Sequence, residues 1–263
     1  MELKVHRATW SGEHPQNSLA GLRECYRERV ARVEIDFRTA GDDFVVTHDA
    51  PRRGAKLVPL SDAIAIVRSA APGPTLLMLD AKDERPWTSA EVARLVRLIE
   101  PVRDRIFVGS PADWNLRRLR AADRDLALAF DPQYYLTWSA RKETLPGRRG
   151  AYGYQDDHPL ALRRTIATVD YLRERFEMLL GLVADVRELH IRVGFLERML
   201  DDGFDAAGHI HRAGALMDVW TLDAGSRAWR TRLARVLAGG ADVVTTNTAR
   251  ELAEAASETE RRA

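Results

Sequence analysis

The chain has 263 residues, 45% hydrophobic and 30% charged, which supports a large folded core and excludes a chain disordered throughout. Its 40 basic and 39 acidic residues leave a formal net charge of +1, without the basic excess of a dedicated nucleic-acid-binding protein. The single cysteine, Cys25, excludes an intrachain disulfide, and we expect a cytoplasmic location. We expect no signal peptide and no transmembrane segment, because no apolar run approaches the ~18 residues of a spanning helix.

Short apolar runs alternate with amphipathic segments along the first half of the chain. A strand is predicted at Leu3–His6, followed by a loop and a helix that Asn17 or Ser18 caps. A further helix is capped by Ser61. Strands are then predicted at Val33–Phe37, Phe44–His48, Thr75–Lys82, Arg105–Gly109 and Leu126–Phe130, and helices at Ser61–Ala70, Ser89–Glu100 and Asp113–Ala121.

The stretch 131–158 is the least regular part of the sequence. Its aromatic, glycine and arginine residues favour a long loop or lid, and a surface insertion without a function is an equal alternative. A long helix is predicted at Leu160–Asp185, and the charged tail Glu258–Ala263 is expected to fray. The remaining strands are predicted at Leu189–Val193, Leu216–Leu222 and Ala241–Thr246, and the remaining helices at Phe195–Leu200, Ala206–Ala213, Ser226–Ala238 and Arg250–Ala256.

Strands that alternate with helices indicate βαβ units and a parallel sheet. The length matches the ~250 residues of a (β/α)₈ barrel, so we predict a single α/β domain of this type over residues 1–263. The nine predicted strands are one too many, and Leu189–Val193 is the weakest of them. The join from Phe37 to Phe44 is too short for a helix. The alternative, an open doubly wound sheet, lacks a glycine-rich phosphate loop after the first strand.

Two carboxylates in Val33–Phe37 are separated by a single intervening residue. Because side chains alternate along a strand, Glu34 and Asp36 share one face, where their charges repel. A divalent cation resolves that conflict, and carboxylate oxygens suit Mg²⁺ or Ca²⁺. His48 ends the next apolar run and is a candidate for proton transfer. The alternative without a functional site is a β-hairpin whose acidic side chains are solvated on one face.

The candidate site residues all lie at or near the predicted C-terminal ends of strands. In a barrel these ends converge on one face, where the active site lies. Arg7 and Lys82 could instead form structural ion pairs with the acids, and the other histidines, His190 among them, show no matching partners. Cys25 is expected in the core. The candidates are His6, Arg7, Glu34, Asp36, His48, Asp80 and Lys82.

The order of these motifs resembles the glycerophosphodiester phosphodiesterase family. The likeness covers both ends of the chain and weakens between about Asp131 and Asp205. It rests on His6-Arg7, Pro15-x-Asn17-Ser18, Glu34-x-Asp36, Val45-Val46-x-His48-Asp49, Asp80-x-Lys82, Val219-Trp220-Thr221-Leu222-Asp223 and the Gly-Ala-Asp-Val-Val-Thr-Thr run of 240–246.

The resemblance implies a (β/α)₈ barrel of the phospholipase-C-like type and a metal-dependent phosphoric diester hydrolase of lipid metabolism. The implied substrate is a small glycerophosphodiester or lysophospholipid-like molecule. One divalent cation, Mg²⁺ or Ca²⁺, would be bound by Glu34, Asp36 and Asp80. His6 and His48 match the acid–base pair, with their individual roles open. Arg7 and Lys82 match phosphate-binding positions, and Trp220 matches an aromatic residue beside the alcohol end of the substrate.

Four departures from the family pattern concern the site. Ala8 replaces a glycine, Gln16 replaces a glutamate, and Asp80 stands where many members carry glutamate. Only Ala50–Val58 separates His48-Asp49 from the next helix, whereas many members carry an inserted subdomain there. An alternative function is therefore a catalytically impaired barrel that binds a phosphorylated ligand.

Overall fold

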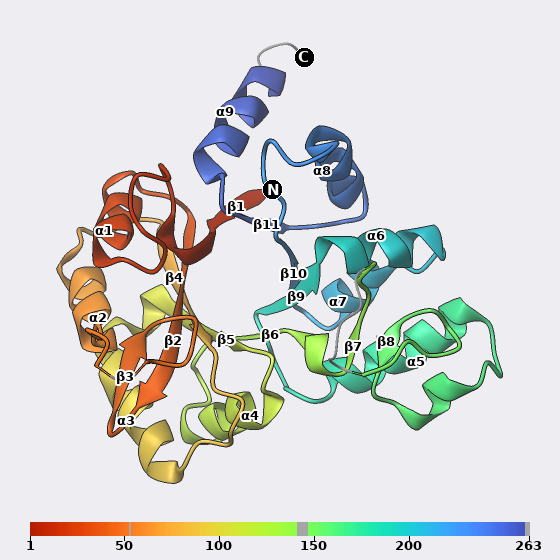
Figure 1. The fold of residues 1–263 in the computed structure, drawn as a ribbon, viewed down its shortest axis with the longest axis horizontal. Helices are drawn as coiled ribbons and strands as arrows, with labels where there is room; N and C mark the ends of the chain where they lie inside the picture. The colour runs from red at the N-terminus through yellow and green to blue at the C-terminus, as the bar shows by residue number, and fades with distance from the viewer. Residues whose placement is uncertain (53, 141–146, 261–263) are drawn as a thin grey trace.

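The computed structural model describes residues 1–52, 54–140 and 147–260, and the side chains of these residues up to 255. Eight parallel strands form a closed barrel, because β1 pairs with both the last strand and β2 (Figure 1). The predicted (β/α)₈ architecture is confirmed. Its strands, in chain order, are β1 (Glu2–Val5), β2 (Arg32–Ala40), β4 (Leu76–Ala81), β5 (Ile106–Ser110), β6 (Leu128–Phe130), β9 (Glu188–Arg192), β10 (Leu216–Trp220) and β11 (Val243–Thr246).

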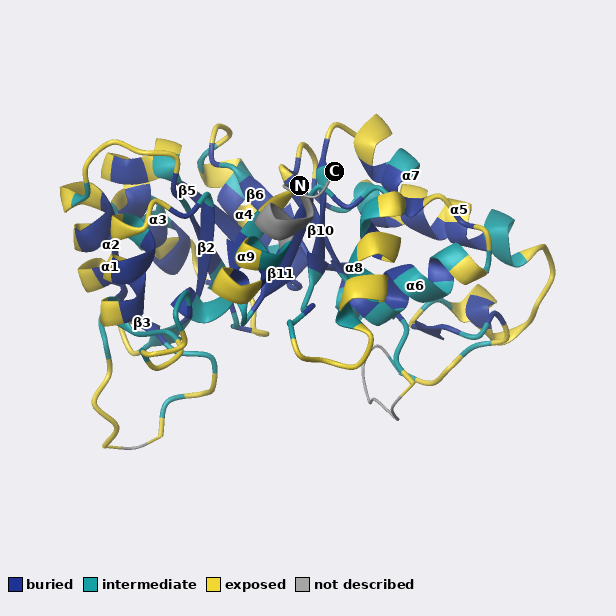
Figure 2. Ribbon diagram, turned by 90° about the horizontal axis from the view of Figure 1, so that it is seen from above, coloured by how far each residue is buried: buried dark blue, intermediate teal, exposed yellow. Residues whose placement is uncertain are grey.

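Helices surround the barrel and cover the outer face of its strands, and side chains of the strands themselves fill the inner face, so the strands are buried on both faces (Figure 2). The side chain of Ser18 caps the first helix, and Thr88 and Glu91 form a capping box at the third. Ser61 is not a cap, since its helix starts one residue earlier, after Pro59. The helices are α1 (Leu19–Arg27), α2 (Leu60–Ser69), α3 (Ser89–Ile99), α4 (Asp113–Ala122), α5 (Thr168–Leu180), α6 (Val193–Asp201), α7 (Ala206–Arg212), α8 (Trp229–Ala238) and α9 (Ala249–Glu260).

The surplus strand is β3 (Asp43–Val46), which lies outside the barrel wall. It pairs antiparallel with β2, because the turn through Gly41 is too short for the crossover that parallel strands need. Leu189–Val193, the weakest of the predicted strands, belongs to the barrel wall. It corresponds to β9, which pairs with β6 and β10.

The segment after β6 is more ordered than the predicted loop. It contains a two-stranded antiparallel sheet of β7 (Leu136–Thr137) and β8 (Gln155–Asp156), and residues 141–146 lie outside the described part of the chain. Arg175 of α5 lies 2.9 Å from Asp156 and ties this sheet to the helix layer.

The predicted long helix at Leu160–Asp185 is wrong in its length. A one-turn 3₁₀ helix at Pro159–Leu162 comes first, and Arg163 then takes an extended conformation that breaks the helical path. The α-helix itself, α5, ends at Leu180, and Gly181 is its C-cap. The residues 261–263 of the predicted frayed tail lie outside the described residues.

Candidate active site

A cavity of about 280 Å³ is lined both by residues within the barrel strands and by residues that follow them. The predicted side chains converge there from β1, β2, β4, β10 and the segment after β3. Asp36 is fully buried beside the cavity, with a carboxylate oxygen close to those of Glu34 and Asp80. The predicted residues that line the cavity directly are His6, Arg7, Glu34, His48, Asp80, Lys82 and Trp220.

Three carboxylates gather at one wall of this cavity. One oxygen each from Glu34, Asp36 and Asp80 lie within 4.8 Å of one another, and Asp36 and Asp80 are register neighbours on β2 and β4. Oε1 of Glu34 is buried and accepts no hydrogen bond from the described residues. Burial, with the negative charges of Asp36 and Asp80, raises the pKa of Glu34 well above its ordinary value. A buried orphan oxygen among three carboxylates fits a hard divalent cation.

A left-handed turn after β1 holds Arg7 against these acids. Arg7 and Ala8 have φ values of 49° and 54°, in a region that favours glycine. The backbone N–H of Arg7 thereby donates to Oε2 of Glu34 at 2.7 Å, and its Nε lies 3.0 Å from Oδ2 of Asp36. Ala8 thus adopts the conformation that the family's glycine suits, and Gln16 accepts a hydrogen bond of 2.9 Å from Arg7.

Lys82 and Asn17 keep Asp36 ionised. Nζ of Lys82 lies 3.0 Å from Oδ1 of Asp36 and also pairs with Asp80. Asn17 donates to Oδ2 of Asp36 at 2.8 Å and accepts the N–H of the same residue. Burial alone would raise the pKa of Asp36, but Lys82, Asn17 and Arg7 lower it below the ordinary value. The ion pairs that the sequence left as an alternative for Arg7 and Lys82 are therefore present, inside the cavity rather than away from it.

The two histidines have different surroundings. Nδ1 of His6 lies 2.7 Å from Oδ1 of Asn247, which leaves Nε2 facing Glu34 at 3.8 Å. Burial, aided by the charges of Arg7 and Lys82, lowers the pKa of His6 below 6.5. The side chain of His48 is 43% exposed, and its Nδ1 lies 2.7 Å from Oδ1 of Asp49. One imidazole is thus half-buried and held neutral, whereas the other is accessible and carboxylate-paired.

No family model matches this sequence, and no curated protein matches it. Solved structures do match over almost the whole chain. A glycerophosphodiester phosphodiesterase from Parabacteroides distasonis is 14% identical, covers 98% of both chains and has a TM-score of 0.66. An Oleispira antarctica phosphodiesterase in complex with the product sn-glycerol-3-phosphate is 16% identical, covers 98% of this chain and 97% of its own, and has a TM-score of 0.61.

A third structure, a glycerophosphoryl diester phosphodiesterase from Silicibacter pomeroyi described as putative, is 14% identical, covers 94% and 90% of the two chains and has a TM-score of 0.64. The chain has the glycerophosphodiester phosphodiesterase fold. At these identities the likeness establishes the fold of the chain alone.

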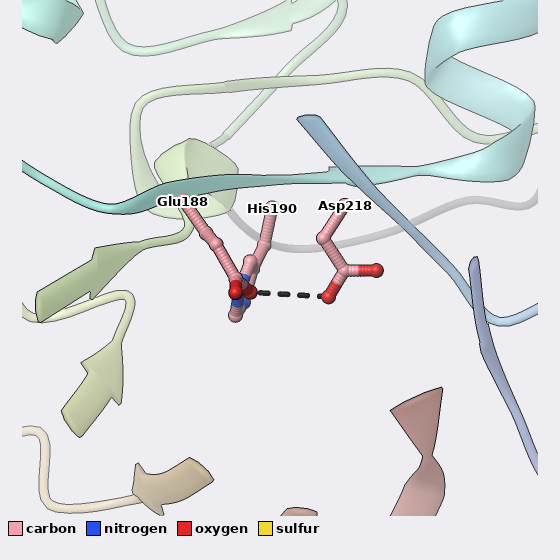
Figure 3. Close-up of side chains that lie close together, drawn as sticks. All are labelled: Glu188, His190 and Asp218. Carbon is pink, nitrogen blue, oxygen red and sulfur yellow. Dashed lines mark hydrogen bonds and ion pairs between the residues drawn. The ribbon is translucent and has the colours of Figure 1, made fainter. Parts of the chain in front are cut away.

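A second polar cluster inside the barrel borders the same cavity, because Lys4, His190 and Asp218 also line it. Glu188 and His190 on β9 and Asp218 on β10 point to one place inside the barrel (Figure 3). Their ligand atoms lie close enough to share a cation, but the ammonium of Lys4 already occupies that position. Nζ of Lys4 lies 2.7 Å from Glu188, 2.6 Å from Asp218 and 3.3 Å from Nε2 of His190.

The prediction that His190 has no partner is therefore wrong. The pattern Glu188-x-His190 places two polar side chains on one face of a strand, the same signal that singled out Glu34-x-Asp36. Local pattern does not show that this strand belongs to the barrel wall, so the signal of Glu188-x-His190 is weaker there. The cavity is also lined by Asp131, which directly follows β6, and by Gln133; both lie in the stretch 131–158 for which a loop is predicted.

Proposed function

We propose that this chain is a metal-dependent phosphodiesterase that cleaves a small glycerophosphodiester or lysophospholipid-like substrate. The observation that carries the proposal is the buried, unpaired Oε1 of Glu34 within the carboxylate group, next to two histidines in one cavity. The glycerophosphodiester phosphodiesterase fold and the product complex of the Oleispira antarctica phosphodiesterase support it.

Glu34, Asp36 and Asp80 would bind one divalent cation, Mg²⁺ or Ca²⁺. When bound, such an ion neutralises the charge that develops on the phosphoryl oxygens. Arg7 and Lys82 would add fixed positive charge on the same side, because both side chains line the cavity and are held there by Asp36. Trp220 would cover the alcohol portion of the substrate.

His6 suits the role of general base. Its lowered pKa keeps the ring neutral at pH 7, and Asn247 holds Nδ1 so that Nε2 is the nitrogen available to take a proton. The nucleophile would be water or a hydroxyl of the substrate. His48 suits the role of general acid that protonates the leaving alcohol, since Asp49 orients its ring at the open side of the cavity.

A cytoplasmic role in lipid metabolism is part of this proposal. The buried, unbridged Cys25 suits a reducing compartment. Among the described residues, no helix combines the length and the apolar character needed to cross a bilayer.

The proposal is tested by hydrolysis of bis(p-nitrophenyl) phosphate and glycerophosphocholine in Mg²⁺ or Ca²⁺, compared with EDTA. We expect cation-dependent turnover that falls at least about 100-fold in His6→Ala and His48→Ala, the scale of acid–base catalysis. His211→Ala is the matched control, because His211 of α7 pairs with Asp242 and does not line the cavity. Cation binding without turnover of any diester would instead favour the impaired barrel, which the changes at Ala8, Gln16 and Asp80 motivate.

A further inference from the structure

Asp131 is a buried carboxyl group in the cavity that the proposed mechanism does not use. It directly follows β6 and is only 8% exposed. Its Oδ1 accepts the backbone N–H of Gln133 at 2.9 Å, and its Oδ2 accepts the side-chain amide of Gln133 at 3.2 Å. Both oxygens are thus fixed by the residue two positions later, and each keeps a further lone pair for a partner.

The position of Asp131 relative to the carboxylate group is suited to contact a substrate. Asp131 and Gln133 line the same cavity as Glu34, Asp80 and Lys82. Arg7 lines this cavity too, so a small molecule held at Arg7 and Lys82 shares the cavity with Asp131. The volume of about 280 Å³ is near the lower end of the ~300–1,000 Å³ typical of ligand pockets, so the bound group must be compact.

The chemistry of Asp131 favours a neutral hydroxyl as its partner. Burial raises the pKa of Asp131 to about 7, against the opposing charge of His190, so neutral and ionised forms coexist near neutral pH. A hydroxyl can donate to the ionised form and accept from the neutral one. A second phosphate or carboxylate would be repelled. An ammonium group would need the ionised form alone.

We propose that Asp131, positioned by Gln133, is the subsite that recognises a hydroxyl group of the alcohol attached to the phosphate. This assignment rests on the proposed function, because it takes the phosphoryl group to lie at Arg7 and Lys82. It makes Asp131 a specificity residue: the barrel selects phosphate esters of small polyols over esters of the same phosphate without a hydroxyl.

Binding separates this inference from catalysis. Calorimetric titration with sn-glycerol 3-phosphate and with methyl phosphate, in the presence of Mg²⁺, compares two ligands that share the phosphate and differ in the hydroxyls. We expect the wild-type protein to prefer sn-glycerol 3-phosphate by at least about tenfold, the scale of one hydrogen bond to a charged group. Asp131→Ala should lose that preference and keep its affinity for methyl phosphate within about threefold.

Two further variants guard against misfolding. Asp131→Asn keeps the acceptor for Gln133 and should retain part of the preference. Asp113→Asn is the matched control, since Asp113 is also buried but contacts Tyr135 and Arg117 and does not line the cavity. Thermal melts of all variants establish that each is folded.

The possible outcomes are distinguishable from failure of the proposed function. Selective binding with no turnover of any diester would reject the phosphodiesterase and keep the subsite. Equal affinity of the wild type for both ligands, or an unchanged preference in Asp131→Ala, would overturn the subsite. Titration with phosphocholine provides a further check. If Asp131→Ala lost affinity for phosphocholine and kept its affinity for sn-glycerol 3-phosphate, the subsite would be overturned in favour of an ammonium partner.

Discussion

Individual side chains in the cavity have their protonation set by burial and by the charges beside them. Glu34 and Asp36 stand two residues apart on one strand, yet their pKa values move in opposite directions. Asp36 forms ion pairs with Lys82 and Arg7 and accepts a hydrogen bond from Asn17. Glu34 accepts one hydrogen bond from a backbone N–H, and its Oε1 has no hydrogen-bond partner among the described residues. Glu34 is therefore the carboxylate whose charge most needs a cation.

Replacing Glu34 with glutamine tests that conclusion. We expect Glu34→Gln to weaken Mg²⁺ or Ca²⁺ binding by at least about tenfold, because the neutral amide loses a charged ligand. In the wild type a proton competes with the cation, so affinity should rise with pH through and above pH 4.5, the ordinary value from which the pKa of Glu34 is raised. The variant should lack that part of the rise. Titration calorimetry at several pH values measures both effects.

Glu197→Gln is the control, because Glu197 pairs with Arg232 on the helix layer. An unchanged cation affinity in Glu34→Gln would remove Glu34 from the proposed ligand set.

At the scale of elements, the contact between α1 and the turn after β1 fixes the site. Gly21 lies so close to this turn that a Cβ at that position would be 2.2 Å from the carbonyl oxygen of Ala8. The helix therefore presses against the left-handed residues that aim Arg7 at Glu34. This close approach explains a glycine inside a helix, where it is otherwise unfavourable.

Gly21→Ala should push the turn away from β2. We expect a loss of about 1–3 kcal/mol in the free energy of unfolding, as for other overpacked positions, and weaker cation binding. Gly181→Ala serves for comparison, because its added Cβ would meet nothing nearer than 3.4 Å and its φ is −76°. Chemical denaturation and calorimetry give the two values. If Gly21→Ala and Gly181→Ala had the same free energy of unfolding, the turn after β1 would move to accommodate the added methyl group without cost.

The ammonium group of Lys4 on β1 lies inside the barrel, between side chains of β9 and β10. Lys4→Ala would leave Glu188 and Asp218 buried beside His190 without their ammonium, and we expect a loss of about 3–5 kcal/mol in stability. Two carboxylates and an imidazole suit Zn²⁺. Added Zn²⁺ should therefore raise the melting temperature of Lys4→Ala well beyond any effect on the wild type. If Zn²⁺ changed the melting temperatures of Lys4→Ala and the wild type equally, the cluster would not keep its arrangement without Lys4.

The sequence predicts helices and strands correctly where the hydrophobic periodicity is strong. It fails where pairing with strands distant in sequence decides the place of a segment in the sheet. Every barrel strand overlaps its predicted range, with ends that differ by at most three residues, because continuous apolar runs identify buried parallel strands. Whether Phe44–His48 or Leu189–Val193 joins the wall depends on pairing partners, which local pattern does not contain. The early start predicted for α5 has the same origin: apolar spacing continues through Leu160 and Leu162, although both are exposed.

At the scale of the whole molecule, the first strand completes the barrel between its second and last strands. β1 forms pairs with β2 and with β11, so residues from both ends of the chain support the same cavity. The convergence of the predicted side chains follows from that closure and could be anticipated once a barrel was inferred. Lys4, Asn247 and Asp131 could not, because their importance lies in contacts between strands that are distant in sequence.

This closure predicts cooperative unfolding of residues 1–263 as one domain. We expect a single transition by both circular dichroism and fluorescence, with coincident midpoints. Mg²⁺ or Ca²⁺ should raise the melting temperature, and EDTA should return it to the cation-free value without unfolding the chain. Two separated transitions would divide the chain into independent units.

The antiparallel strand β3 has a consequence for how this protein could diversify. His48 follows a strand that contacts the barrel through β2 and one bridge to Pro59, and it contributes nothing to the ring of parallel pairs. Residues could therefore be added between Asp49 and Pro59 without shifting the register of any wall strand. A new specificity loop grafted there would reshape the entrance beside one catalytic candidate, while the cation-binding wall kept its alignment.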